Sequence, residues 1–192
     1  MLGLTGGIGA GKSLALVAFA RLGAAVISAD DLVHEAYRDP GLVESVRARF
    51  GDGAVRGDGT IDRAGLGRLA FADAEATRDL ERLVHPRVAA ARDRWVAEQR
   101  ARVPPPPLLV CEVPLLYEAG LEHSFDAVLV VTAPEDVRRD RVAERGQDFS
   151  ARSARQVPEE EKVARADRYV VNDGTPSDLE AWVAARYAEY AQ

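Results

Sequence analysis

The sequence predicts an α/β fold in which a five-stranded parallel sheet is flanked by helices. Five short apolar runs are predicted strands, and several of them lack polar alternation, which indicates strands that are covered on both faces. Segments with helical spacing lie between these runs. The chain has 192 residues, of which 47% are hydrophobic and 29% charged. A chain of this length and composition is expected to bury a core as one domain.

The first two strands enclose a glycine-rich loop and a helix. In the helix, apolar residues recur at three and four positions between Leu14 and Leu22, and the pattern stops near Gly23. Strand, loop, helix and strand in this order form a βαβ unit, for which we expect a right-handed crossover. The five predicted strands are Leu2–Thr5, Ala24–Ser28, Leu108–Val113, Ala127–Thr132 and Tyr169–Val171.

A long segment without a convincing strand interrupts the alternation after the second strand. Helical patterns recur in it, such as Asp79–Gln99, where His85-Pro86 is expected to interrupt the helix, and Gly51–Gly59 is a turn-rich corner. We therefore predict a helical insertion at the edge of the sheet. The expected division is a core of about residues 1–30 and 105–192 and an insert of about residues 31–103.

Composition and charge exclude several classes of protein. The net charge of −6 argues against a general nucleic-acid binder, which needs a basic surface. Cys111 is the single cysteine, so neither a disulfide framework nor a cysteine-based metal site is expected. No apolar run reaches the roughly 18 residues of a membrane span, and the first residues do not resemble a signal peptide. We expect a cytoplasmic protein, a monomer or weak homo-oligomer, without membrane or nucleic-acid partners.

The segment GGIGAGKS, residues 6–13, matches the Walker A pattern G-x-x-x-x-G-K-[ST] at every fixed position. In this arrangement backbone N–H groups surround a phosphate, and side chains at the glycine positions would block its approach. The helix that begins near Lys12 adds its positive dipole end. Lys12 is expected to reach the outer phosphates, and the hydroxyl of Ser13 to ligate Mg²⁺. Phosphate binding can thus offset the entropy that ordering these glycines costs.

Two carboxylates at predicted strand ends suit a small-molecule kinase. Such an enzyme needs a carboxylate near the acceptor hydroxyl, a metal, and cations beside the transferred group. Asp30 follows the second strand, where α/β sheets place ligands, and is the candidate base, with helix capping as the alternative; capping is favoured for Asp31. Glu112 lies near the end of the third strand and is either a metal ligand through water or a solvated carboxylate. A GTPase is disfavoured because the sequence has no guanine-reading Asn-Lys-x-Asp.

Basic residues follow the fourth predicted strand. Arg138, Arg141 and Arg145 recur at i, i+3 and i+7, so one helical face is expected to present three guanidinium groups. Arg152, Arg155 and Gln156 come next. As a group beside a phosphate loop, these residues favour a lid of about residues 138–165 that closes over ATP and excludes water. Exposed arginines paired with nearby glutamates are the alternative.

Five segments follow one another from residue 2 to about residue 175: GLTGGIGAGKS, VISAD, the HP of His85-Pro86, VPLLYE and RSARQVPEEEKVARADRYVVNDG. Taken together and in this order, they resemble the dephospho-CoA kinase family. The resemblance implies ATP-dependent phosphorylation of the ribose 3′-hydroxyl of dephospho-CoA, the last step of coenzyme A synthesis, with Mg²⁺. It also implies a P-loop NTPase/kinase fold with a helical insert that receives the CoA moiety and a lid.

The resemblance implies roles for individual residues as well. Catalytic roles fall on Asp30, as the base, and on Lys12 and Arg141. ATP-binding positions are Gly7, Ile8, Gly9, Ala10, Gly11, Lys12, Ser13, Leu14, Arg141 and Asn172. Acceptor-binding positions are Thr5, Asp30, His85, Pro86, Leu115 and Leu116, and metal positions are Ser13 and, through water, Glu112. For His85, a purely structural role is the equal alternative.

Some positions depart from the family pattern. Ser28 stands where a second aspartate is common, Leu14 where a threonine is usual, and Arg138 where a glutamine is frequent. The interval from Arg145 to Gln156 is shorter than usual, which predicts a lid that is clipped by about one turn. Two alternatives stay open: a P-loop kinase for a nucleoside, nucleotide or small hydroxy metabolite, and a non-enzymatic nucleotide-gated binding module.

Overall fold

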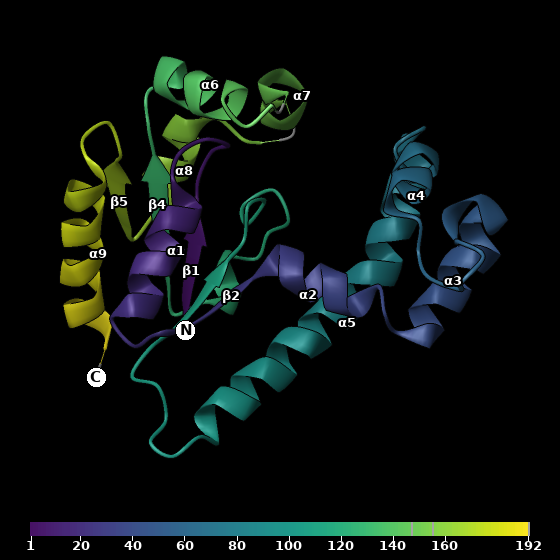
Figure 1. Cartoon of the computed structure of the whole chain (residues 1–192), viewed down its shortest axis with the longest axis horizontal. Coiled ribbons are helices and arrows are strands. Elements are labelled where there is room, and N and C mark those ends of the chain that lie inside the picture. The colour runs from purple at the N-terminus through teal and green to yellow at the C-terminus, as the bar shows by residue number, and fades with distance from the viewer. Residues whose placement is uncertain (147, 155, 192) are drawn as a thin grey trace. The chain divides into compact units, whose positions relative to one another are not determined.

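A computed structural model of the chain describes residues 1–146, 148–154 and 156–191. In this part of the chain five parallel strands form one sheet in the order β2-β3-β1-β4-β5, which confirms the predicted fold class (Figure 1). The ends of each strand lie within one residue of the prediction. The strands are β1 (Leu2–Thr5), β2 (Ala25–Ser28), β3 (Leu109–Glu112), β4 (Ala127–Thr132) and β5 (Arg168–Val171).

The register of the sheet brings several strand ends to one edge. Glu112 at the end of β3 lies opposite Leu4 of β1 on one side and Ser28 of β2 on the other. On the far side of β1, Thr5 lies opposite Val130 of β4. The loops that leave the carboxyl ends of these strands therefore start beside one another, where α/β sheets bind ligands.

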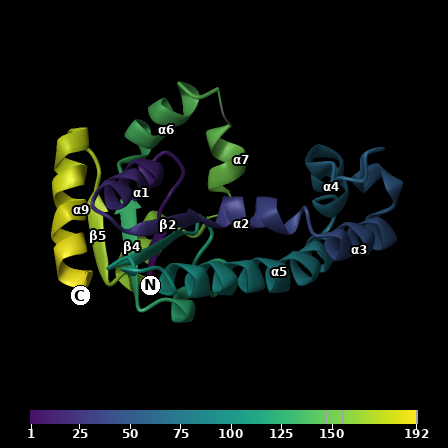
Figure 2. The ribbon, with the colours of Figure 1, turned by 60° about the horizontal axis from the view of Figure 1, so that its bottom comes forward.

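Helices α1 (Lys12–Arg21) and α9 (Pro176–Tyr190) lie side by side against the sheet, as Figures 1 and 2 both show. Phe19 of α1 and Leu179 of α9 pack with Leu129 of β4 in the main core. A reciprocal capping box between Thr175 and Asp178 starts α9. The remaining helices of this part are α6 (Glu135–Ala143), α7 (Phe149–Ser153) and α8 (Glu159–Arg165), beside α1 (Lys12–Arg21), α9 (Pro176–Tyr190) and the short η2 (Glu122–Ser124).

The chain divides into two compact units. The first contains the sheet and comprises Met1–Ser28 and the chain from Arg102 onward, and the second is Ala29–Ala101. The second unit is built of α2 (Ala29–Ala36), α3 (Pro40–Phe50), η1 (Asp52–Ala54), α4 (Arg63–Ala70) and α5 (Ala74–Arg100). Asp39, Asp62 and Asp73 each cap the helix that follows, through a backbone N–H.

Two expectations for the second unit were wrong. The helix does not break at His85-Pro86, because α5 runs through Pro86 from Ala74 to Arg100. Leu80 and Val84 before the proline and Ala91 after it are all buried, and this continuous packed face outweighs the lost hydrogen bond. Asp31 is not a helix cap either: α2 begins at Ala29, so Asp30 and Asp31 both lie in its first turn, where the helix dipole favours acidic groups.

None of the helices in the described ranges combines the length and the apolar character that a membrane span requires.

Candidate active site

The loop between β1 and α1 is packed so closely that glycine is required in it. Gly9 has a φ of +79°, and a Cβ there would lie 2.5 Å from the backbone oxygen of Arg138. Gly11 has a φ of +107°, and a Cβ there would lie 2.3 Å from Nδ2 of Asn172. Any side chain at either position would be strained and would displace a neighbouring segment.

The N-terminus of α1 opens onto this loop. Gly11 is its N-cap residue, no side chain of the described residues caps it, and its first turn carries no acidic residue. Helix N-termini of this kind offer backbone N–H groups and a positive dipole end to an anion. The side chain of Lys12 is 9% exposed and folds back across the loop, where Nζ donates to the backbone oxygen of Gly7 at 3.0 Å. The loop therefore combines an anion cradle with a cation.

Two residues from other elements hold the loop from one side. Asn172 directly follows β5: its N–H donates to the oxygen of Thr132 at 2.7 Å, and its Nδ2 donates to the oxygen of Ala10 at 2.8 Å. Arg141 of α6 donates to the oxygens of Asn172, at 3.1 Å, and of Gly9, at 3.5 Å. The ends of β4 and β5 thereby fix the position of the loop.

These residues share one pocket. Its lining includes seven of the predicted ATP-binding residues, whereas Gly7, Ile8 and Ala10 lie in the loop beside it. Gly174 and Pro176 were not predicted from the sequence. The NDGTP turn after the last strand is a signal for them, because it leaves the same edge of the sheet. The lining residues are Gly9, Gly11, Lys12, Ser13, Leu14, Arg141, Arg145, Asn172, Gly174 and Pro176.

The expected helical face of three arginines was wrong. Helix α6 ends at Ala143, so Arg145 follows the helix, although it still lines the pocket. Arg138 is buried, and its Nε donates to the oxygen of Ala133 at 3.0 Å, which makes it a structural part of the wall. The side chain of Arg152 and the whole of Arg155 lie outside the described residues.

Several expected acceptor and metal positions lie at the neighbouring strand ends. Leu115 is 40% exposed, whereas Leu116 is fully buried, and a Cβ on Gly3 would lie 2.9 Å from its Cδ1. Thr5 is also fully buried, and its hydroxyl has no hydrogen-bond partner among the described residues. Glu112 is 9% exposed at the end of β3. Ligand contacts by these residues stay a prediction.

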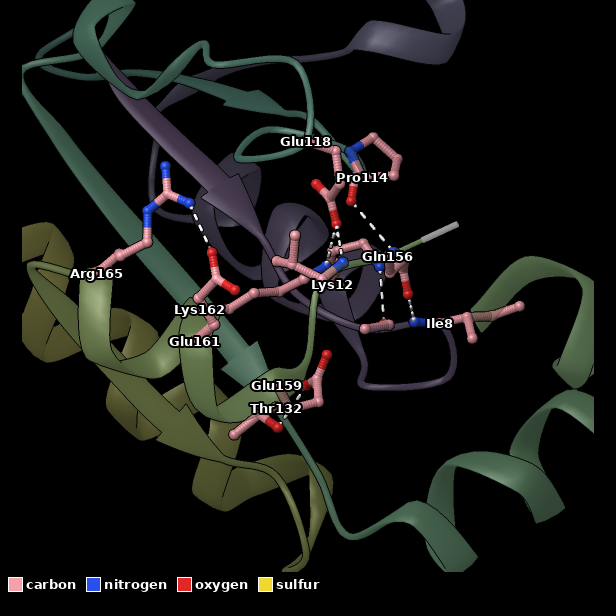
Figure 3. Close-up of polar contacts among 12 residues, drawn as sticks. Ile8, Lys12, Pro114, Glu118, Thr132, Gln156, Glu159, Glu161, Lys162 and Arg165 are labelled. Carbon is pink, nitrogen blue, oxygen red and sulfur yellow. Dashed lines mark hydrogen bonds and ion pairs between the residues drawn. The ribbon is translucent and has the colours of Figure 1, made fainter. Parts of the chain in front are cut away.

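Gln156, which was predicted from the sequence only as part of the lid, contacts the phosphate loop directly. Oε1 of Gln156 accepts from the N–H of Ile8 at 3.0 Å, and its Nε2 donates to the oxygen of Pro114 at 3.2 Å (Figure 3). Gln156 begins the motif Gln-x(5)-Lys-x(3)-Ala-Asp-x(4)-Asn, and Pro114 begins Pro-Leu-Leu-x-Glu. The two motifs therefore meet at the loop.

A buried ion pair joins the same two motifs. Lys162 of α8 is fully buried, and its Nζ lies 3.1 Å from Oε1 of Glu118. The same carboxylate oxygen accepts from the N–H of Val157 at 2.8 Å. Nearby, the hydroxyl of Thr132 donates to Glu159 at 2.6 Å (Figure 3). The start of α8 is thus attached both to the segment after β3 and to the end of β4.

Tyr117, which precedes Glu118 in the sequence, is buried as well. Burial raises the pKa of its phenol to about 12, against the opposing effect of the positive charge of Arg165. The Arg165 guanidinium stacks over the ring at 4.3 Å from its centre. The phenol therefore stays uncharged near neutral pH.

In the second unit, the predicted residues lie on two helices. Asp30 is in the first turn of α2, two positions after the end of β2 along the chain. His85 and Pro86 are exposed on α5 and line an open pocket together with Arg78, Glu81 and Arg82.

Comparison with known proteins places the chain among small-molecule kinases. The sequence model of a family described as dephospho-CoA kinase matches residues 1–178. Dephospho-CoA kinase of Anaeromyxobacter dehalogenans is 44% identical over 185 residues, which cover 93% of this chain and 86% of that protein. That of Aromatoleum aromaticum is 41% identical, with coverage of 99% and 93%.

Solved structures share the fold. A crystal structure of a protein from Thermus thermophilus has a TM-score of 0.86 and 35% identity, with 100% of this chain and 97% of that chain covered. Dephospho-CoA kinase from Campylobacter jejuni has a TM-score of 0.65 at 24% identity, with coverage of 99% and 96%, and supports the fold alone.

The close packing around Gly9 predicts that a methyl group added at this position weakens ATP binding. Gly9→Ala should weaken ATP binding by about 5- to 150-fold, because strain of this kind amounts to about 1–3 kcal/mol. The measurement is calorimetric titration with ATP. Gly57→Ala is the matched control, since nothing lies within 4 Å of a Cβ there, and it should bind as the wild type does. An unchanged dissociation constant for Gly9→Ala would contradict the described packing.

Proposed function

The chain belongs to the dephospho-CoA kinase family, which catalyses the final step of CoA biosynthesis, and we propose that the pocket beside residues 6–13 is its ATP site. ATP there donates its γ-phosphate to the ribose 3′-hydroxyl of dephospho-CoA, which yields CoA and ADP. The observation that carries the proposal is the convergence of the glycine cradle, Lys12, Arg141 and Asn172 on one pocket.

On the donor side, cations stabilise the charge of the phosphoryl group as it is transferred. The transition state spreads negative charge over the equatorial oxygens, so catalysis consists mostly of positioning and electrostatic stabilisation. Lys12 reaches the outer phosphates from within the loop, and Arg141 acts from α6. Gly7, Ile8, Gly9, Ala10, Gly11, Ser13 and Leu14 complete the cradle, and Asn172 lies near the adenine.

The residues at the loop suit Mg²⁺ that arrives with ATP. Protein-bound Mg²⁺ keeps several waters and takes one or two protein ligands beside substrate phosphates. That small requirement fits the residues present, because the hydroxyl-bearing Ser13 lines the pocket and the carboxylate of Glu112 stands at the end of β3. Ser13 would hold the ion through its hydroxyl and Glu112 through water. When bound, Mg²⁺ neutralises part of the phosphate charge.

On the acceptor side, Asp30 orients or deprotonates the 3′-hydroxyl for in-line attack on the γ-phosphate. Its support is its place along the chain, two positions after the end of β2, because residues that follow the strands of such folds bind ligands. The second unit receives the CoA moiety with His85 and Pro86, and Thr5, Leu115 and Leu116 belong to the acceptor side of the core.

The segment of about residues 138–165 covers the ATP site as the lid and excludes water as a competing acceptor, and the ion pair of Lys162 with Glu118 fixes its C-terminal part. We place the enzyme in the cytoplasm, as a monomer or weak homo-oligomer that acts on small molecules. The net charge of −6 is the reason to expect no nucleic-acid partner.

The proposal predicts ADP release that depends on the acceptor. Purified protein with MgATP should release ADP with dephospho-CoA, matched by CoA formation, and should release little with adenosine or AMP. Lys12→Ala should lower kcat by about 100-fold or more, because a cation at the transferred group is lost, while the unfolding transition stays near that of the wild type.

The controls in this assay separate the alternatives. Equal turnover of adenosine or AMP would favour a kinase of broader acceptor range. ATP binding without turnover of any acceptor would favour a nucleotide-gated binding module. Near-normal kcat in Lys12→Ala would contradict the assignment of the loop.

The role of Asp30 predicts a difference between two neighbouring carboxylates. Asp30→Asn should lower kcat by about 100-fold or more, the typical contribution of a positioned base, with little change in the dissociation constant of ATP. Asp31→Asn is the matched control, since it lies in the same first turn of α2, and it should retain most of the activity. A loss confined to ATP binding in Asp30→Asn would instead place Asp30 at the nucleotide.

A further inference from the structure

The side chain of Gln156 uses both ends of its amide to join two segments of the first unit. Its oxygen accepts from the N–H of Ile8, and its nitrogen donates to the oxygen of Pro114 (Figure 3). We propose that Gln156 is a positioning residue. It holds Gly7 and Ile8, the outer turn of the phosphate loop, at a fixed place against residues 114–118. This role rests on the kinase function proposed above. It adds to that function a residue that acts by fixing the position of the phosphate loop.

The chemistry of the two partners makes this bridge specific for glutamine. A backbone N–H can only donate and a backbone oxygen can only accept, so the amide has one orientation that satisfies both Ile8 and Pro114. Glutamate offers no donor to Pro114 at neutral pH, and methionine, of similar length, offers neither group. The contact with Ile8 spans 148 positions of the sequence, so it is a tertiary link and not a local turn.

The residues that follow Gln156 anchor it to the same segment. The N–H of Val157 donates to Glu118, and the fully buried Lys162 pairs with the same carboxylate oxygen. Removing one partner of a buried ion pair is strongly destabilising, so the start of α8 is firmly fixed on the 114–118 segment. Gln156 therefore extends from a rigid base to the loop.

Gly9 and Ala10, the inner part of the loop, are held by other contacts that do not involve Gln156. Asn172 binds the oxygen of Ala10 and Arg141 that of Gly9, whereas Gln156 binds Ile8. Next to Ile8, the oxygen of Gly7 accepts from Lys12. Loss of the Gln156 bridge should therefore leave ATP bound by the inner loop but misplace the outer turn and Lys12 relative to the transferred phosphate. Small displacements of this kind cost about 100-fold in rate.

The experiment compares Gln156→Met with the wild type and with Gln99→Met, which makes the same chemical change on α5 of the second unit. For Gln156→Met, kcat with saturating ATP and dephospho-CoA should fall by about 10- to 100-fold, while the dissociation constant of ATP changes less than about threefold. Amide hydrogen exchange of Ile8 should become faster. Gln99→Met should match the wild type in all three measurements.

A second variant keeps the proposal testable should Gln156→Met fold poorly. Gln156→Glu retains an acceptor for Ile8 but no donor for Pro114, so Ile8 exchange should stay slow while kcat still falls. Wild-type kcat in both variants would overturn the proposal. A weaker ATP affinity with unchanged kcat would overturn it as well, because Gln156 would then act in binding.

Failure of the proposed function would look different. It would appear as wild-type protein that turns over no dephospho-CoA, whereas the exchange of Ile8 and the affinity for ATP would still report on the bridge.

Discussion

The close approach of other chain segments to the phosphate loop is the constraint on which the rest of the first unit depends. The backbone of Arg138 and the side chain of Asn172 lie where side chains of Gly9 and Gly11 would be. These segments follow β4 and β5, so the loop after β1 can form only if β4 and β5 pair next to β1 in that order, as they do. The order of the strands and the glycines of the loop therefore depend on each other. Together they keep the backbone N–H groups of the loop directed at a common point.

The same constraint explains why motifs far apart in the sequence occur together. Pro114 and Glu118 belong to one motif, and Gln156 and Lys162 to another, yet their hydrogen bonds and ion pair join them beside the loop. A buried charge needs a partner, so a fully buried lysine requires the carboxylate that Glu118 supplies. Part of what looks like a substrate signature in this sequence is thus the support of the loop.

The sequence allowed the strands and the loop to be predicted because both depend on local patterns. Unbroken apolar runs mark strands that are buried on both faces, and GGIGAGKS has few uses other than phosphate binding. Features that depend on tertiary packing were missed. A proline normally costs a helix about 3 kcal/mol, but the buried face of α5 continues past Pro86. The end of α6 before Arg145, the burial of Leu116 and the contact of Gln156 with Ile8 likewise depend on partners distant in sequence.

The phosphate-binding role of the loop is tested most directly by following the backbone amides of the isotope-labelled wild-type protein by NMR as MgATP is added. The largest shifts, and slowed hydrogen exchange, are expected at the amides of Gly9, Gly11, Lys12 and Ser13, with smaller changes at Arg141 and Asn172 around the same pocket. Binding of ATP that leaves the loop amides unchanged and perturbs another surface would contradict the claim that this loop is built to hold phosphate.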